Sequence, residues 1–144
     1  MVKLTKLGQY LGEYRHNLTE KYRISLPKRI RVEIEGFDVV LTRGFEQCIA
    51  GFDKQRWQKI ADEQLVIQFN EERGRELRRQ LFSSAMIVEL DGQGRVVLPE
   101  ALLSWAGLKG KVGEELIVIG AGDHFEIWQK DKWEAYTARF NFEK

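Results

Sequence analysis

Basic side chains that could contact phosphate groups are concentrated in one short stretch of this 144-residue sequence. Residues 15–31 contain a single acidic residue, Glu20, although the whole chain carries a net charge of only +1. The cations of this stretch are Arg15, Lys21, Arg23, Lys28, Arg29 and Arg31. Such a patch is the electrostatic footprint expected of phosphate binding. A solvated basic face without a partner is the alternative, and the charges alone leave both open.

Arginine and lysine imply different contacts within this stretch. The guanidinium group can pair bidentately with guanine, so Arg15 and Arg23 are candidates for base or groove contact. Lys21, Lys28 and Arg29 are expected to contact phosphates, which fix the position of a protein on a duplex without reading its sequence. An internal ion pair or a hydrogen bond within the turn is the alternative for Arg23.

Other reactive side chains do not form a convincing catalytic set. Cys48 with His16 or His124 could supply a nucleophile and a base, but the spacing suggests no third orienting group, and a lone thiol in an apolar strand is usually a packed hydrophobe. Two histidines and one cysteine cannot complete a usual zinc site without carboxylates. The glycine-containing segments 107–112 and 120–125 match no phosphate-loop fingerprint. We therefore expect no enzyme, metal or cofactor.

The sequence contains two diverged copies of one unit. Its two prolines, Pro27 and Pro99, close the similar strings RISLP at 23–27 and RVVLP at 95–99, an offset of 72. Further along, at an offset of 76, Gly44, Lys54 and Trp57 align with Gly120, Lys130 and Trp133. Self-similarity at a fixed period indicates a repeated structural unit.

Each copy has the periodicity of a ββαββα unit that opens with a hairpin. A proline after the second strand is suited to the first turn of a helix, and Gly107 is suited to the end of one. The strands are expected at 11–17, 23–26, 39–43 and 48–52, then at 86–90, 95–98, 115–119 and 125–128, with closing helices at 54–65 and 130–140. The apolar run at 116–119 does not alternate, so both of its faces should be covered, and the copies must share a core.

A connecting helix is expected between the copies. The chain is divided into a first repeat at 10–65, a helix at 70–82 and a second repeat at 84–140. Leu77 and Leu81 give the helix one narrow apolar seam. Its alternating arginines and glutamates indicate a solvent-facing helix with ion pairs, and a second DNA-contacting surface is the alternative.

The composition indicates a globular protein of the reducing cytosol. The chain is 43% hydrophobic and 31% charged, with 8 Phe, 4 Trp and 4 Tyr to bury. One cysteine cannot form an internal disulfide. Because no apolar run approaches about 20 residues and the first residues lack the apolar region of a secretory signal, we expect neither membrane insertion nor export.

Several strings together resemble one known family. These are GEYRHNL at 12–18, RISLP at 23–27, RGFEQC at 43–48, DGQGRVVLP at 91–99 and FEIW at 125–128. Their order and spacing resemble the MraZ family of bacterial regulators over nearly the whole chain, from Gly12 to about Tyr136.

The resemblance implies an α+β fold in which two AbrB-like swapped-hairpin repeats form one intertwined, β-barrel-like core. It also implies sequence-specific binding of double-stranded DNA by a ring-like homo-oligomer, at promoter-proximal repeats of the division and cell wall gene cluster. The location would be cytoplasmic and nucleoid-associated, with no small-molecule substrate. A two-stranded ribbon, the expected shape of the first hairpin, fits the DNA major groove.

The first copy departs from the family pattern Asp-x-x-x-Arg. The second copy keeps the pattern as Asp91 and Arg95, for which an internal ion pair is the favoured interpretation, whereas the first has Thr19 in place of the aspartate. Tyr22 stands where a glycine is usual, which questions a positive φ there. A protein-interaction module of the antitoxin type is the remaining alternative, although such proteins usually carry one short hairpin domain and a disordered tail.

Overall fold

The structure is a computed structural model that describes residues 4–140. Its strands are β1 (Glu13–Asn17), β2 (Arg23–Ser25), β3 (Asp38–Arg43), β4 (Ile49–Asp53), β5 (Met86–Glu89), β6 (Arg95–Val97), β7 (Glu115–Gly120) and β8 (Phe125–Gln129). Its helices are α1 (Lys28–Arg31), α2 (Lys54–Val66), α3 (Glu72–Ser83), α4 (Glu100–Ala106) and α5 (Lys130–Ala138). The order ββαββα thus occurs twice with α3 between, which confirms the predicted repeat.

The helix boundaries follow from local chemistry that recurs in both halves. Pro27 and Pro99 precede the first turns of α1 and α4, and Gly107 ends α4 with a φ of 72°. The Asp53 carboxylate accepts a hydrogen bond from the third residue of α2, and Gln129 does the same for α5. These caps satisfy backbone N–H groups that a helix start leaves without partners.

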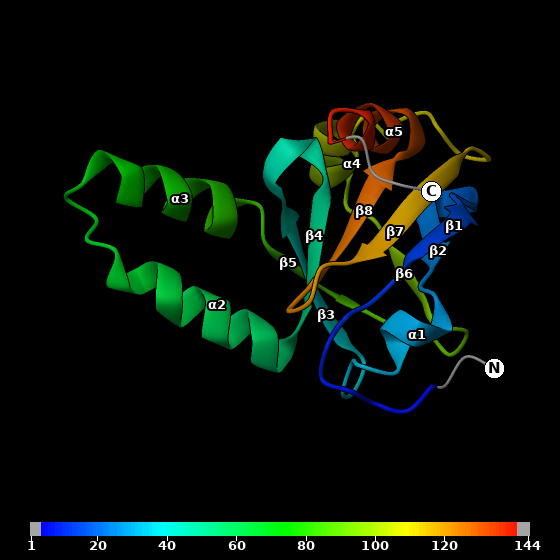
Figure 1. Cartoon of the computed structure of the whole chain (residues 1–144), viewed down its shortest axis with the longest axis horizontal. Coiled ribbons are helices and arrows are strands. Elements are labelled where there is room, and N and C mark those ends of the chain that lie inside the picture. The colour runs from blue at the N-terminus through cyan, green and yellow to red at the C-terminus, as the bar shows by residue number, and fades with distance from the viewer. Residues whose placement is uncertain (1–3, 141–144) are drawn as a thin grey trace.

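The two halves exchange strands. The larger sheet has the order β1-β7-β8-β4-β3-β5, with antiparallel pairing throughout, so the first strand of each half lies beside the third strand of the other. β2 and β6 pair with each other in a separate two-stranded sheet. The predicted hairpins are therefore wrong in their pairing: β1 does not pair with β2, nor β5 with β6, and Figure 1 shows β1 lying along β7.

Reciprocal hydrogen bonds show that the exchange is symmetric. The backbone N–H of Leu26 donates to the carbonyl of Gly94 at 3.0 Å, and that of Leu98 donates to the carbonyl of Tyr22 at 2.9 Å. Both partners are related by the same offset of 72. Because each half completes its backbone hydrogen bonds with the other, the two copies form one folding unit, as the need for a shared core predicted.

The core draws on both halves. Ile24 and Val96 face inward from the small sheet, and the run Leu116–Val118 of β7 is fully buried. The outer face of that run carries Ile117, which packs with Cys48 and Trp128 under α5. Both faces of β7 are thus covered, as predicted. The sheet does not close into a barrel among residues 4–140, since β1 and β5 remain its edges, and the predicted barrel-like core is corrected to an open antiparallel sheet.

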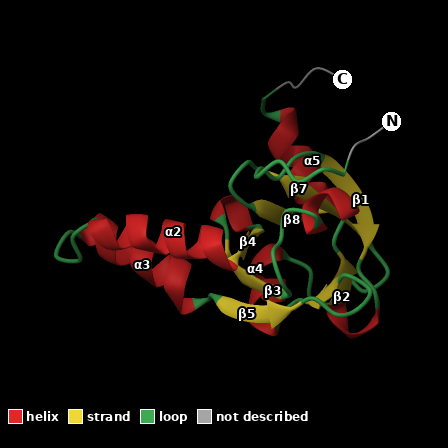
Figure 2. Ribbon diagram, turned by 90° about the horizontal axis from the view of Figure 1, so that it is seen from below, coloured by secondary structure: helices red, strands yellow, loops and turns green. Residues whose placement is uncertain are grey.

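Helices α2 and α3 form a hairpin that projects from the sheet on the side away from β1 and α1 (Figures 1 and 2). The Thr42 hydroxyl of β3 donates to the carbonyl of Leu81 at 2.6 Å and so ties the base of α3 to the sheet. The predicted ion pairs along α3 are absent from the described residues. Arg75 and Arg78 donate instead to carbonyls between 65 and 70, because the end of α2 leaves such groups without partners.

Candidate nucleic-acid interface

Arg15 lies on the outer face of β1 and is exposed. Its guanidinium forms an ion pair with Glu115 on the neighbouring strand, at 3.1 Å, and Lys130 also approaches this carboxylate, at 3.5 Å. Two cations share one acceptor here. Exposed pairs of this kind contribute little to stability, so Arg15 can exchange Glu115 for a phosphate or a base at small cost.

The turn Thr19–Arg23 connects β1 to β2 and carries two of the predicted site residues. Thr19 takes the place of the family's aspartate and donates from its hydroxyl and its N–H to the carbonyl of Arg23, at 3.0 and 2.9 Å. Lys21 and Tyr22 both have positive φ, at 61° and 54°. The tyrosine hydroxyl accepts a hydrogen bond from Gly110 N–H at 3.0 Å. The turn therefore keeps the left-handed backbone without a glycine.

The cationic groups of this turn are not neutralised by neighbours. Lys21 is exposed and Arg23 is partly exposed. Among residues 4–140, neither side chain forms an ion pair or a hydrogen bond with another residue. The alternative for Arg23, an internal pair, is not found in this part of the chain, and both charges are available to a ligand.

The cations of α1 have three different environments. Lys28 is exposed at the first position of the helix. Arg31 is partly buried and lies against Gly94 in the second half, where a Cβ would come within 2.2 Å of its Nη1. Its Nε is buried without a hydrogen-bond partner in the described structure. Burial, and then the Arg31 charge, lower the pKa of His16. Arg31 thus reaches from the first half toward the turn of the second.

Arg29 does not suit the predicted phosphate contact. It is only 7% exposed, and its Nη2 donates to Glu33 at 2.7 Å while Nη1 donates to the carbonyl of Thr5. Glu33 also accepts the N–H groups of Leu7 and Gly8. Burial favours a raised pKa for Glu33, but these N–H groups and Arg29 outweigh it and hold the pKa low. The spacing of four between Arg29 and Glu33 was a sequence feature that could have revealed this pair.

In the second half, the signature arginine Arg95 is paired with a carboxylate. Arg95 Nε donates to Asp91 at 2.8 Å, and the other carboxylate oxygen accepts the N–H groups of Gln93 and Arg95. These backbone bonds, together with the side chain of Arg95, hold the pKa of Asp91 below its usual range. The internal pair predicted for Arg95 is confirmed. Gly94 supplies the positive φ, at 75°.

The cations predicted to contact DNA therefore belong to one half. Their positions correspond, at the offset of 72, to side chains that are apolar, neutral or acidic in the second half. Arg15, Lys21, Lys28 and Arg31 align with Ile87, Gln93, Glu100 and Leu103. Of the six cations at 15–31, only Arg23 has a cation, Arg95, at its equivalent position, and of these two only Arg95 is held by a carboxylate among the described residues.

The nucleophilic site considered from the sequence is not formed. Cys48 is buried, its thiol donates to the carbonyl of Phe45 at 3.1 Å, and burial raises its pKa, with nearby Glu126 and Glu46 adding to the effect. His124 is held by Asp123 and Glu126, at 2.7 and 2.8 Å. Among residues 4–140, no group of three metal-ligating side chains is placed to hold an ion, and no helix is long and apolar enough to span a membrane.

Comparisons with known proteins agree with the repeat. A family model described as "MraZ protein, putative antitoxin-like" matches residues 10–80 and again residues 81–144. A solution structure from Pyrococcus horikoshii matches over 81% of this chain and 95% of its own, at 17% identity and a TM-score of 0.36.

Curated relatives of this chain carry the name transcriptional regulator MraZ, which agrees with the expectation that the chain is not an enzyme. The protein of Roseiflexus sp. (strain RS-1) is 39% identical over 126 residues, covering 87% of this chain and 84% of the relative. That of Lactobacillus helveticus is 37% identical over 132 residues, covering 92% and 89%. That of Syntrophomonas wolfei is 39% identical over 128 residues, covering 89% and 86%. With both halves matched and relatives aligned over most of its length, the chain belongs to the MraZ family.

Proposed function

We propose that this protein is a sequence-specific DNA-binding transcriptional regulator and that the cations of its first half contact the duplex. The relatives named as transcriptional regulators support the general role. The observation that carries the assignment of the surface is the guanidinium of Arg23, which is partly exposed and has no carboxylate partner among the described residues. The proposed contact surface consists of Arg15, Lys21, Arg23, Lys28 and Arg31.

The roles divide by side-chain chemistry. Arg23 and Arg15 are assigned to base edges or the groove because a guanidinium can donate two parallel hydrogen bonds to guanine. Lys21 and Lys28 are exposed point charges suited to phosphates. Arg29 is left out, because moving it to a phosphate would strand the buried carboxylate of Glu33.

The exchanged strands support the further proposal of an AbrB-like swapped-hairpin repeat in each half. We also propose that several copies of this chain assemble into a ring and meet repeated sites near the promoter of the division and cell wall gene cluster, in the cytoplasm and at the nucleoid. One surface with a handful of phosphate contacts binds weakly at cellular salt. Several linked surfaces raise the effective affinity by about 10²- to 10⁴-fold when their spacing matches that of the sites.

The test is a gel-shift titration of the DNA just upstream of this protein's own gene, repeated at several salt concentrations. Arg23→Ala should weaken specific binding by about 1–3 kcal/mol, or about 5- to 150-fold. Arg95→Ala is the matched control and should change affinity much less, because Asp91 already holds that charge. Equal losses for both variants would reject the assignment, and no binding by the intact protein would favour an interaction module.

Lysine substitution separates phosphate contact from base contact. Lys28→Ala should weaken specific and unrelated DNA alike and reduce the slope of log affinity against log salt by about 0.9. A loss confined to the specific site would contradict the phosphate role. Light scattering after size exclusion tests the ring, and a strictly monomeric mass would count against it.

A further inference from the structure

His16 is a partly buried histidine of β1 whose imidazole has no hydrogen-bond partner among residues 4–140. Strand alternation places it on the face of β1 opposite to the exposed Arg15. Its register partner in β7 is the apolar Leu116, and the Tyr14 hydroxyl, on the same face of β1, donates to the carbonyl of Leu11 at 2.8 Å. Within the described structure, the sheet therefore makes no use of this imidazole.

Arg31 of α1 is the charged group that acts on His16. Burial lowers the pKa of this histidine, and the Arg31 charge lowers it further. Among the described residues no other charged group shifts this pKa, neither Arg23 on β2 nor Glu115 on β7. The neutral imidazole is therefore favoured, and a nearby anion would reverse that preference.

The guanidinium of Arg31 has no counter-ion within the described structure. It is partly buried, it packs on Gly94, and its Nε lacks a hydrogen-bond partner. Asp91, in the same turn as Gly94, is bonded instead to Arg95 and to two backbone N–H groups. A partly buried charge without a partner costs free energy, and a bound anion would reduce that cost. Two basic side chains thus lie within electrostatic reach of each other, and no described carboxylate neutralises them.

The fold does not require bases at these two positions. At the offset of 72, His16 and Arg31 correspond to Val88 and Leu103 in the second half. Leu103 is buried in the core, and Val88 packs against it. Because the repeat accepts apolar side chains in the same places, the two bases of the first half are better explained by a ligand than by packing.

Lys28 extends the pair of bases toward solvent. It is exposed, and its spacing of three residues places it on the same side of α1 as Arg31. A guanidinium, an ammonium and a protonated imidazole are all hydrogen-bond donors, so the matching ligand is an anion with several acceptor oxygens. A phosphate group fits such a set better than a carboxylate does, because it carries more charge and more oxygens.

We propose that His16 and Arg31, beside Lys28, form a site for a phosphate group, and that His16 takes up a proton from solvent when the phosphate binds. The terminal nitrogens of Arg31 and the protonated imidazole donate to different phosphate oxygens. The site rests on the proposed function where the phosphate belongs to the DNA backbone, and a free phosphate group is the other source of the same chemistry.

The test follows the imidazole resonances of both histidines by NMR, in the full-length protein, as the pH is varied. Inorganic sulfate, which stays fully ionised, stands in for free phosphate, with chloride at equal ionic strength as its reference, and the upstream duplex is the second ligand. A rise in the pKa of His16 with the duplex assigns the site to the DNA backbone, and a rise with sulfate alone assigns it to free phosphate. No rise with either ligand overturns the proposal. A duplex that does not bind refutes the proposed function, and sulfate then decides the site.

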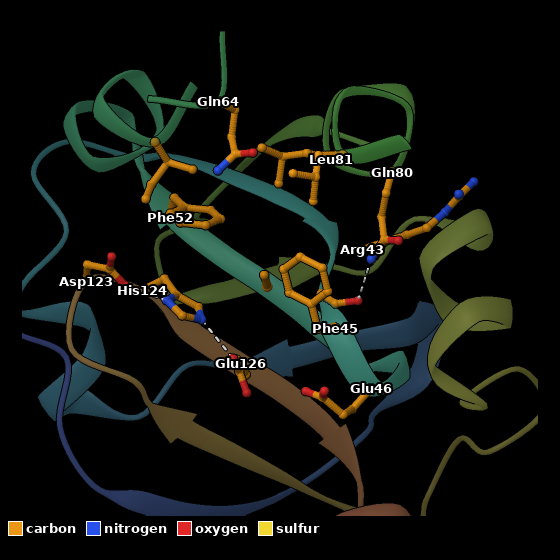
Figure 3. Close-up of a pocket in the computed structure, with 14 residues that line it drawn as sticks. Arg43, Phe45, Glu46, Phe52, Gln64, Gln80, Leu81, Asp123, His124 and Glu126 are labelled. Atoms are coloured by element: carbon orange, nitrogen blue, oxygen red, sulfur yellow. Dashed lines mark hydrogen bonds and ion pairs between the residues drawn. The ribbon is translucent and has the colours of Figure 1, made fainter. Parts of the chain in front are cut away.

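His124 is the internal control. It lines a cavity of about 250 Å³ between the α2–α3 hairpin and β4, and Figure 3 shows it beside Asp123 and Glu126. Burial favours a lowered pKa here too, but the bonds to these two carboxylates outweigh it and raise the pKa. Neither ligand should move the pKa of His124, because both of its ring nitrogens already have partners. An equal rise for both histidines would reveal a general effect of the added anion and would refute the site.

Three variants carry the test to DNA affinity. The parent protein should bind the upstream duplex about five- to tenfold more tightly at pH 6 than at pH 8, since the pKa of His16 is higher in the complex. His16→Val, which introduces the residue of the second half, should reduce this ratio to less than about twofold. Asn17→Val, on the exposed face of the same strand, is the control and should keep the ratio of the parent. Arg31→Leu should abolish the effect of sulfate on His16. An equal ratio in the parent and in His16→Val would refute the assignment, and if His16→Val does not fold, the NMR titration of the parent protein decides.

Discussion

The turns Thr19–Arg23 and Asp91–Arg95 occupy equivalent places in the two halves, and they treat the same arginine in opposite ways. In the second half Asp91 accepts bonds from the arginine side chain and from two backbone N–H groups. In the first half a threonine hydroxyl bonds only the backbone, and the guanidinium is left without a carboxylate among the described residues. In the second copy the aspartate stabilises the turn and pairs with the arginine, whereas in the first copy the arginine charge is available for binding.

The comparison extends to the helices that follow these turns. In the first half, Arg29 of α1 forms a buried ion pair with Glu33, which lies just after the helix. At the equivalent positions of the second half stand Ala101 and Trp105, which form no such pair. The second copy thus has an alanine and a tryptophan at the positions where the first copy has two charged residues. The following variants test these differences, from the largest expected effect to the smallest.

Arg29→Ala should destabilise the protein by about 3–5 kcal/mol, because it leaves the buried Glu33 carboxylate without its cation. Chemical denaturation by urea measures the loss. The exposed neighbour provides the control, since Lys28→Ala should change stability by less than about 0.5 kcal/mol. Similar losses of unfolding free energy for the two variants would contradict a buried pair of Arg29 and Glu33.

The same pair predicts a dependence on pH. The folded-state pKa of Glu33 lies below the value of an unfolded glutamate, which is about 4.3. Its contribution to stability is therefore complete above that value and is lost as the pH falls through the folded-state pKa. Arg29→Ala should flatten this acid-side decline in the free energy of unfolding. An unchanged decline would assign it to other carboxylates.

Thr19→Asp gives the first turn the aspartate of the second. The new carboxylate should capture Arg23 as Asp91 captures Arg95, and specific DNA binding should fall by about 1–2 kcal/mol, or about 5- to 30-fold. Fluorescence anisotropy with the upstream DNA measures the change. Thr19→Asn introduces an uncharged side chain of the same shape as aspartate, so this variant should bind DNA nearly as tightly as the parent protein does. Equal losses in both variants would mean that the hydroxyl, and not the free charge, matters.

Gly94→Ala tests the glycine that the first turn lacks. A residue with a Cβ at positive φ costs about 1–2 kcal/mol, and here Arg31 must also move away from the new methyl group. Gly92→Ala is the control in the same turn, because nothing lies within 4 Å of its Cβ. Thermal unfolding measures the change, and the melting temperature should fall only for Gly94→Ala. A similar shift in both would place the effect in the unfolded chain.

Lys21→Asn should give the smallest change in stability, an increase of less than about 1 kcal/mol, because asparagine tolerates a positive φ better than lysine. DNA binding should become weaker instead. The slope of log affinity against log salt should fall by about 0.9, because one phosphate contact is lost. These opposite directions separate backbone strain from binding. A fall in stability would show that the left-handed conformation costs lysine nothing.

Sequence patterns predicted the elements well because those depend on neighbours in the chain. Pro27 and Pro99 marked the helix starts, Gly107 marked a helix end, and the strings around Arg23 and Arg95 marked the repeat. The strand partners were predicted wrongly, as local hairpins, since β2 and β6 have the same alternation and each suits several neighbours. Periodicity reports which face of a strand is buried, not which strand lies beside it.

The candidate site was predicted in part for a similar reason. A run of cations is visible in the sequence, but whether each is exposed depends on residues distant in the chain. Glu115 approaches Arg15 across the sheet, and Gly94 packs on Arg31. The Tyr22 hydroxyl also has a distant partner, Gly110, whose N–H donates to it. None of these partners lies in the segment where the cations were recognised.

The exchange of strands has a consequence for biosynthesis. As the chain leaves the ribosome, Glu13 cannot pair until Ile119, its distant partner across β1 and β7, has been made. Pairing between segments so far apart is slow, and unpaired strand edges invite association with other nascent chains. The charges along residues 15–31, which repel their own copies, would also protect the waiting amino-terminal half from such association.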